Sequence, residues 1–142
     1  MKKPTESKFD REKIAKIIDD IEKYFKELRS WDINSERLEN KQTFYAVSLL
    51  IFSIANRYID LGNEIISAMK LGVPSTYKDI FYILYQNKII NNLTKEAFFR
   101  VLECRNAIAH RYHDVTKSEV LDSAETLPVI ERFLKRAKDM IG

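Results

Sequence analysis

Apolar residues recur along the chain at the three- and four-residue spacing of amphipathic helices. The first such stretch covers residues 8–29, where charged side chains separate the apolar positions Ile14, Ile17, Ile18, Ile21, Tyr24, Phe25 and Leu28. This spacing places the apolar side chains on one face, so it predicts a helix over residues 8–29. Residues 1–7 precede the pattern, and we expect them to be frayed.

A second, longer helix is predicted from about residue 35 to residue 70, with Asn34 as its N-cap. Its middle, residues 44–61, is apolar on most sides, which is typical of a helix at the centre of a core or of an interface. Gly62 is a candidate bend in this helix. The helix should end before residues 71–75, where glycine and proline interrupt the pattern.

Two shorter helices are expected next, over residues 76–87 and residues 95–112. Thr94 stands at the end of a polar loop and is the predicted N-cap of the second. In the first of these, Tyr77, Ile80, Phe81 and Leu84 would face inward. The connections between all these segments are short, as they are between antiparallel neighbours in helical bundles.

A last helix should begin after Thr116, because Thr116 and Glu119 have the spacing of a capping box. Pro128 lies inside its apolar stripe and should kink the helix or split it in two. The chain shows no internal repeat and no convincing strand pattern. We therefore predict an all-α fold, an antiparallel up-and-down bundle of about five helices within a single domain over residues 1–142.

Composition agrees with this fold and narrows the functional classes. Hydrophobic residues make up 45% and charged residues 32% of the 142 positions, and only three glycines and three prolines interrupt them. The formal charge of +3 is compatible with nucleic acid but is too small to argue for it. Cys104 is the single cysteine, so an internal disulfide and a cysteine-rich metal site are excluded. No uninterrupted apolar run approaches about 20 residues, so we expect a cytoplasmic protein that does not use a membrane.

Residues 105–112, Arg-Asn-Ala-Ile-Ala-His-Arg-Tyr, carry the chemistry that stands out. Arg105 offers a permanent cation whose planar fork matches phosphate, and His110 can transfer protons near neutral pH. Asn106 and Tyr112 add an amide and a phenol to the same helical segment. Together these groups could handle a phosphodiester without a metal.

The spacing constrains how these groups meet. Arg105 and His110 are five residues apart, or about 140° around an ideal helix, so they should not touch on a continuous helix. Two arrangements would bring them together: a helix that loosens near His110, or a dimer whose two copies line one cleft.

Residue types alone also allow a purely structural explanation. An arginine within an apolar face is often ion-paired or extended toward water, and a histidine near a helix C-terminus interacts well with the helix dipole. Tyr112 could likewise be an ordinary core residue. Arg57 and Arg100 could form a basic rim for RNA, although most such charges are simply solvated.

The chain resembles the HEPN superfamily, and more closely the HepT-like toxins that are paired with minimal nucleotidyltransferases. Their signature is an Arg, four residues, a His, one residue and a Tyr, usually with a polar residue directly after the Arg. Arg105, Asn106, His110 and Tyr112 fill these positions. The resemblance covers roughly residues 35–125 and includes the segments Tyr58 to Asn63, Pro74 to Asp79 and Lys88 to Ile90.

The resemblance implies a metal-independent endoribonuclease that needs no cofactor. His110 would be general base or acid on the ribose 2′-hydroxyl or the 5′-oxygen, and Arg105 would stabilise the charged phosphorane. Asn106 would orient substrate or hold His110. The expected products are a 2′,3′-cyclic phosphate and a 5′-hydroxyl, so DNA would not be cleaved.

Partners are implied in the same way. The RNA substrate could be tRNA or mRNA, and a homodimer formed through the core helices would complete the catalytic cleft. A minimal nucleotidyltransferase antitoxin would silence the enzyme by adding AMP to Tyr112. Two alternatives remain: a non-catalytic HEPN module that binds nucleotides or serves a nucleotidyltransferase as its partner subunit, and a helical dimer with a structural polar cluster.

Overall fold

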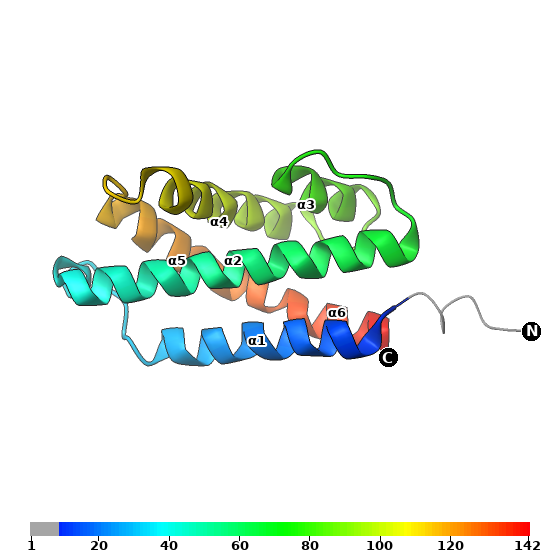
Figure 1. The fold of residues 1–142 in the computed structure, drawn as a ribbon, viewed down its shortest axis with the longest axis horizontal. Helices are drawn as coiled ribbons and strands as arrows, with labels where there is room; N and C mark the ends of the chain where they lie inside the picture. Colours follow the sequence, from blue (N-terminus) through cyan, green and yellow to red (C-terminus); the bar gives the residue numbers. More distant parts are fainter. Residues whose placement is uncertain (1–8) are drawn as a thin grey trace, which may run out of the picture.

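The computed structural model describes residues 9–142, and these form a bundle of six α-helices and one short 3-10 helix, without strands (Figure 1). The elements are α1 (Arg11–Arg29), η1 (Arg37–Glu39), α2 (Lys41–Met69), α3 (Tyr77–Gln86), α4 (Asn92–Arg111), α5 (Lys117–Glu131) and α6 (Phe133–Ile141). Helices α1, α2, α4 and α5 alternate in direction along the long axis (Figure 1). The predicted all-α, up-and-down bundle is confirmed. The expectation of frayed residues 1–7 falls outside the described residues.

Helix α2 begins at Lys41, later than the predicted start at about residue 35. The side chain of Asn34 accepts the N–H of Arg37 at 2.8 Å and thereby opens the short 3-10 helix η1. Asn40 then takes an extended backbone conformation and accepts the N–H of Thr43 at 3.1 Å, so it is the N-cap of α2. The prediction of Asn34 as the cap of the long helix was therefore wrong, because two asparagines each begin a separate helical turn.

The start of α4 needed a similar correction. Asn91, not Thr94, is the N-cap, and its side chain accepts the N–H of Thr94 at 2.9 Å. Thr94 thus lies in the first turn. The predicted capping box of Thr116 and Glu119 is confirmed at the start of α5.

The last predicted helix is two helices, α5 and α6, as Pro128 suggested. Proline has no N–H to donate, and its ring crowds the carbonyl group one turn earlier. The chain stays helical through Pro128 to Glu131 and breaks at Arg132. The split is confirmed, and it lies one turn after the proline.

Helix α2 forms the centre of the bundle and packs against α1, α3, α4 and α5. Tyr58, which is buried, meets the rings of Phe25 and Phe98 edge-on and donates its hydroxyl hydrogen to the carbonyl of Ile130 at 2.8 Å. By length and composition alone α2 could cross a membrane. Half of its most apolar 18-residue window is buried inside the bundle.

Gly62 brings α3 close to α2. The α2 helix continues without interruption through Gly62, and a Cβ atom at this position would collide with Cγ2 of Ile80 on α3. The missing side chain therefore lets α3 lie against α2. This contact fixes the position of Tyr77, the first residue of α3.

Candidate functional site

Arg105 is held between α4 and α2 by neutral groups. Its Nε donates to Oδ1 of Asn56 on α2 at 2.9 Å, and its Nη1 donates to Oδ1 of Asn106 at 3.0 Å. Within residues 9–142 its Nη2 makes no hydrogen bond. Two amides therefore fix the plane of the guanidinium while they leave donors available.

Two aromatic rings also contact the guanidinium of Arg105. The guanidinium carbon of Arg105 lies 5.2 Å from the ring centroid of Phe52 and 4.8 Å from that of Tyr77. Phe52 lies one turn before Asn56 on α2. Aromatic faces attract a cation without neutralising its charge, so Arg105 is stabilised and keeps its full positive charge.

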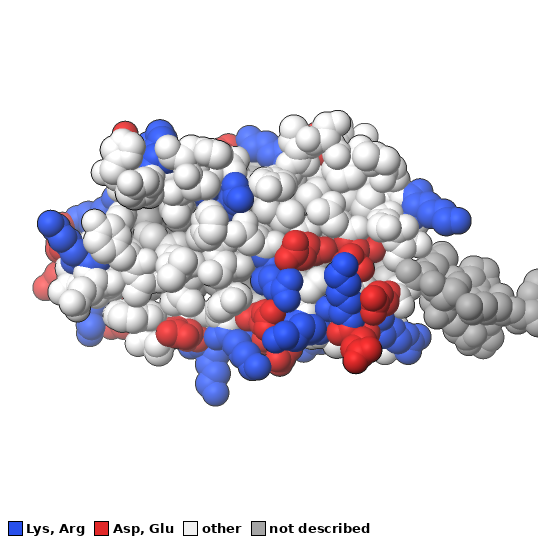
Figure 2. All heavy atoms as spheres, in the orientation of Figure 1, with Lys and Arg blue, Asp and Glu red and all other residues white. Residues whose placement is uncertain are grey.

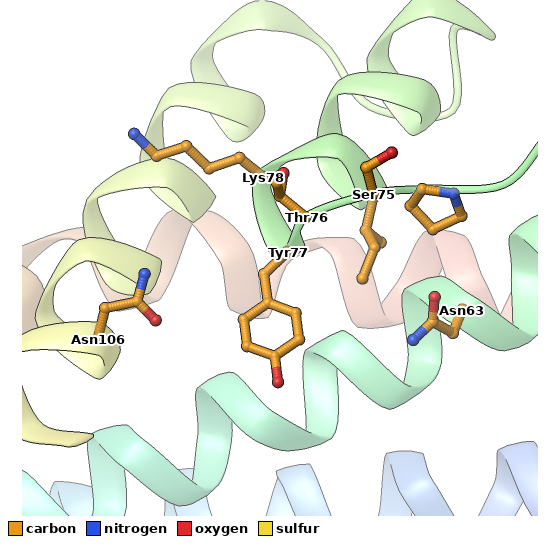
Figure 3. A pocket seen from close by; sticks show the side chains of 8 residues that line it. Asn63, Ser75, Thr76, Tyr77, Lys78 and Asn106 are labelled. Atoms are coloured by element: carbon orange, nitrogen blue, oxygen red, sulfur yellow. The ribbon is translucent and has the colours of Figure 1, made fainter. Parts of the chain in front are cut away.

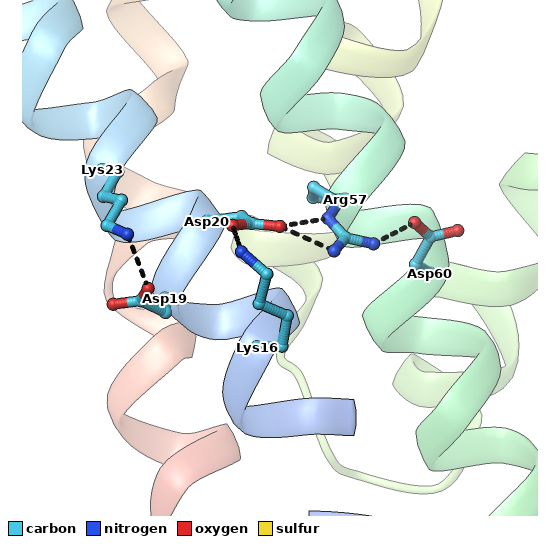
Figure 4. Close-up of polar contacts among 6 residues, drawn as sticks. All are labelled: Lys16, Asp19, Asp20, Lys23, Arg57 and Asp60. Atoms are coloured by element: carbon cyan, nitrogen blue, oxygen red, sulfur yellow. Dashed lines mark hydrogen bonds and ion pairs between the residues drawn. The ribbon is translucent and has the colours of Figure 1, made fainter. Parts of the chain in front are cut away.

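The charge of Arg105 has no counter-ion in the described part of the chain, because no carboxylate forms an ion pair with it. Arg57 provides the contrast (Figure 4): it binds Asp20 at 2.6 Å and Asp60 at 2.9 Å, and hydrogen bonds to these carboxylates raise its pKa. The idea of Arg57 as a rim for RNA therefore finds no support. A half-buried cation without a partner is instead a candidate anion site.

His110 lies in the last turn of α4 with its side chain exposed. The helix remains regular as far as Arg111, so the loosened-helix arrangement is not seen. Among the hydrogen bonds of residues 9–142, none joins His110 to Arg105 or to Asn106. On this regular helix Arg105 and His110 are five residues apart, so they lie on different sides of α4, as the spacing predicted. No hydrogen bond within one copy joins them in the described residues.

Tyr112 is the residue that ends α4, and 74% of its surface is exposed. The alternative in which Tyr112 is a core residue is therefore excluded. Its ring meets that of His113 edge-on, with centroids 5.5 Å apart. It also lines an apolar groove of about 260 Å³ between α2 and the end of α4, together with Phe44, Tyr45, Leu49, Phe52 and Ile108.

Charged side chains are unevenly distributed around this region (Figure 2). Acidic and basic groups gather over α1 and the adjacent part of α2, while the surface over the start of α2 and the end of α4 is mostly uncharged. Tyr45 and Leu49, at 62% and 63% exposed, belong to that uncharged surface. It lies beside the motif.

A cavity of about 510 Å³ opens beside Tyr77 and Asn106, two of the residues that contact Arg105 (Figure 3). Its walls are Asn63 of α2, residues 74–78 with Ile80 of α3, and Asn106 of α4. Figure 3 places Tyr77 between Asn63 and Asn106, with its ring directed toward α2. Asn106 therefore both accepts a hydrogen bond from Arg105 and lines this cavity.

Sequence reasoning did not anticipate the contacts of Phe52, Asn56 and Tyr77 with Arg105. The expectation that Tyr77 faces inward was wrong: as the first residue of α3 it is 42% exposed and lies against Arg105. Phe52 belongs to the apolar stretch for which the sequence predicted a place in the core. One signal was available for Asn56: it interrupts the apolar middle of α2 with an amide that needs a partner when buried.

Comparison with known proteins identifies the family. The family model described as "Ribonuclease HepT-like" matches residues 14–137, which include α2, α3, α4 and α5. The chain belongs to the HepT-like family. No curated protein matched the chain.

Solved structures agree with this HepT-like assignment at the level of the fold. The cytosolic protein of unknown function YutE from Bacillus subtilis is 20% identical, with a TM-score of 0.80 over 92% of this chain and 90% of that one. A tri-AMPylated Shewanella oneidensis HEPN toxin, solved in complex with an MNT antitoxin, is 22% identical, with a TM-score of 0.80 over 89% and 96% of the two chains. A toxin–antitoxin structure with AMP-PNP is 21% identical, with a TM-score of 0.81 over 89% and 97%.

Proposed function

We propose that this HepT-like protein is a metal-independent endoribonuclease and the toxin of a toxin–antitoxin pair. The observation that carries the proposal is the half-buried charge of Arg105, which two amides and two rings hold without a counter-ion. A phosphate group would supply the missing negative charge and accept hydrogen bonds from the free side of the guanidinium. The family's description as a ribonuclease supports the same conclusion.

The proposed reaction is transesterification within RNA. The ribose 2′-oxygen attacks phosphorus and loses its proton to a base, while the 5′-oxygen leaves and gains a proton from an acid. His110 has the chemistry for either proton transfer, and Arg105 stabilises the charge on the phosphorane. The products are a 2′,3′-cyclic phosphate and a 5′-hydroxyl. No cofactor takes part.

A homodimer would supply the second half of this site. Arg105 and His110 are five residues apart on a regular helix, or about 140° around it, so we do not expect one copy to present both side by side to the same phosphodiester. The uncharged surface around Tyr45 and Leu49 lies beside the motif and suits contact with a second copy. Such a dimer would bring the two copies of α4 together near a two-fold axis.

The proposed partner is a minimal nucleotidyltransferase antitoxin. The similar Shewanella oneidensis toxin is AMPylated and bound to an MNT antitoxin, and Tyr112 of this chain is an exposed phenol beside the motif. AMP on Tyr112 would add negative charge and bulk near the cleft and would repel RNA. The proposed compartment is the cytoplasm, where both RNA and such a partner would be met.

Cleavage of total RNA and of a tRNA pool in EDTA tests the proposal, with Arg105→Ala and His110→Ala proteins beside the wild type. The wild-type protein must first be shown by intact mass to carry no AMP. We expect wild-type cleavage that leaves cyclic phosphate ends, and loss of at least a hundredfold in both variants. Absence of cleavage by AMP-free protein would instead favour the non-catalytic nucleotide-binding module.

A further inference from the structure

We propose that the cavity between α2, α3 and α4 binds an RNA nucleobase next to the phosphate held by Arg105 and so sets which sequences are cut. This inference rests on the proposed ribonuclease function. It assigns a further role to residues 74–78, of which Tyr77 also contacts Arg105. At about 510 Å³ the cavity falls within the range of roughly 300–1,000 Å³ that is usual for small-molecule sites.

The position of the cavity ties it to the proposed catalytic group. Asn106 lines the cavity and also accepts the hydrogen bond from Arg105 at 3.0 Å. Tyr77 lines the cavity and lies against the guanidinium, whose carbon is 4.8 Å from the ring centroid. A phosphate on Arg105 would therefore place a base of the same nucleotide, or of its neighbour, at the mouth of the cavity.

The charges in the walls favour an uncharged ligand group. Lys78 is paired with Glu103 at 3.2 Å. The carboxylate of Asp79 accepts the N–H groups of Ser75 at 2.9 Å and Thr76 at 3.2 Å, so these two donors just before α3 are already used. Within residues 9–142, the site thus combines a cation without a counter-ion, Arg105, with a largely apolar cavity whose charged side chains are already paired. A nucleotide has the same division, with a charged phosphate and a neutral base.

The side chains suit a nucleobase in particular. Tyr77 is 42% exposed and offers a ring on which a base can stack. The amide of Asn63 is exposed and makes no hydrogen bond within residues 9–142, and the amide nitrogen of Asn106 likewise makes none. An amide presents a donor beside an acceptor, which matches the edge of adenine. Sequence-specific RNA recognition commonly stacks a splayed base and reads its edge in this way.

Sequencing of the cut ends in total RNA would test the assignment. Asn63→Ala removes an exposed amide that we propose contacts the edge of the base. Gln86→Ala is the matched control, because it removes an exposed amide at the far end of α3, away from the cavity. We expect the wild type and Gln86→Ala to share a base preference at one position flanking the cut. Asn63→Ala should weaken that preference by about fivefold to tenfold. An unchanged preference in Asn63→Ala would overturn the inference.

A binding measurement separates this inference from the proposed function. Fluorescence anisotropy would compare short single-stranded oligo(A), oligo(C), oligo(G) and oligo(U) on His110→Ala protein, with and without Asn63→Ala. If the wild type cleaves no RNA, the proposed function fails and the binding data decide. A base-dependent affinity that Asn63→Ala removes would support the cavity as a base site. Equal affinity for all four oligonucleotides would refute it.

Discussion

The guanidinium of Arg105 on α4 stacks on the ring of Tyr77, the first residue of α3, with 4.8 Å between the guanidinium carbon and the ring centroid. The orientation of the motif arginine therefore depends on a second helix. Tyr77→Ala should reduce RNA cleavage by about tenfold, because a cation–π contact contributes roughly 0.5–2 kcal/mol. Tyr77→Phe should cleave RNA nearly as well as the wild type, since it keeps the ring.

Tyr82→Ala is the control for this change, because Tyr82 is another exposed tyrosine of α3 and makes no contact with Arg105. Initial rates of RNA cleavage would be compared for the four proteins. If Tyr77→Ala and Tyr82→Ala behaved alike, the stacking of Arg105 on Tyr77 would have no part in activity.

A second prediction concerns Asn56, the uncharged side chain that accepts a hydrogen bond from Arg105. Asn56→Asp would place a carboxylate 2.9 Å from Nε of Arg105 without changing the shape of the side chain. The new ion pair would neutralise Arg105 and compete with phosphate, so RNA binding and cleavage should both fall by on the order of tenfold or more. Asn56→Ala removes one hydrogen bond but leaves the charge, and it should have the smaller effect.

Anisotropy with a labelled single-stranded RNA would measure this difference, and thermal unfolding would show whether either variant is misfolded. Stronger RNA binding by Asn56→Asp than by Asn56→Ala would mean that the charge of Arg105 is not used for phosphate.

Tyr112 and Tyr45 form a matched pair for the proposed AMP transfer. Both phenols are exposed, at 74% and 62%, and both line the groove between α2 and the end of α4. After incubation with the cognate nucleotidyltransferase and ATP, intact mass should show AMP on the wild type and on Tyr45→Phe, and none on Tyr112→Phe. Equal modification of Tyr112→Phe would place the acceptor at another residue.

The sequence predicted most of the helices because their apolar positions repeat regularly and their ends carry strong signals. The capping box of Thr116 and Glu119 involves residues three apart in the chain, and so does not depend on tertiary structure. The N-cap of α2 was misplaced because the side chains of Asn34 and Asn40 each accept a backbone N–H three residues later, and the long helix begins only after the second. Local patterns can name two candidates without choosing between them.

The site was harder to predict because it is made across helices. The divergence of Arg105 and His110 follows from helical geometry alone and was expected. The contacts of Arg105 with Asn56 and Tyr77 join residues 49 and 28 positions apart (105 minus 56, and 105 minus 77). These contacts depend on how α2 and α3 pack against α4, and the spacing of apolar residues within one helix does not specify that packing.

Cys104 should be nearly inert while the protein is folded. Burial raises the pKa of its thiol from 9.0 to about 11. At pH 8 the native thiolate fraction is then roughly 0.1%, against roughly 10% for the unshifted thiol. A chromogenic disulfide reagent should react slowly with native protein and quickly in denaturant. Because the folded pKa is the higher one, stability from the neutral thiol is complete below about pH 9 and is lost as the pH rises toward 11.

The close approach of α2 and α3 at Gly62 should affect both the stability of the bundle and the position of Tyr77. In an open helix, Gly→Ala should stabilise by about 1 kcal/mol through helix propensity. Here the new methyl group would collide with Ile80, so we expect Gly62→Ala to lower the free energy of unfolding by about 1–3 kcal/mol. Relief of the collision would push α3 away from α2 and carry Tyr77 off Arg105. Cleavage should therefore fall even at temperatures where the variant remains folded.

Urea unfolding and RNA cleavage would be measured on Gly62→Ala beside Ser67→Ala, an exposed position near the end of the same helix. A second variant, Gly62→Ala with Ile80→Ala, keeps the added methyl group and removes Cγ2 of Ile80, the atom that this methyl group would meet. Ile80→Ala alone leaves a cavity in the core, so the double variant should lose less stability than the two single variants added together, and it should cleave RNA better than Gly62→Ala. A higher urea midpoint for Gly62→Ala than for wild type would show that α3 yields freely, and that the close approach of α2 and α3 does not position Tyr77.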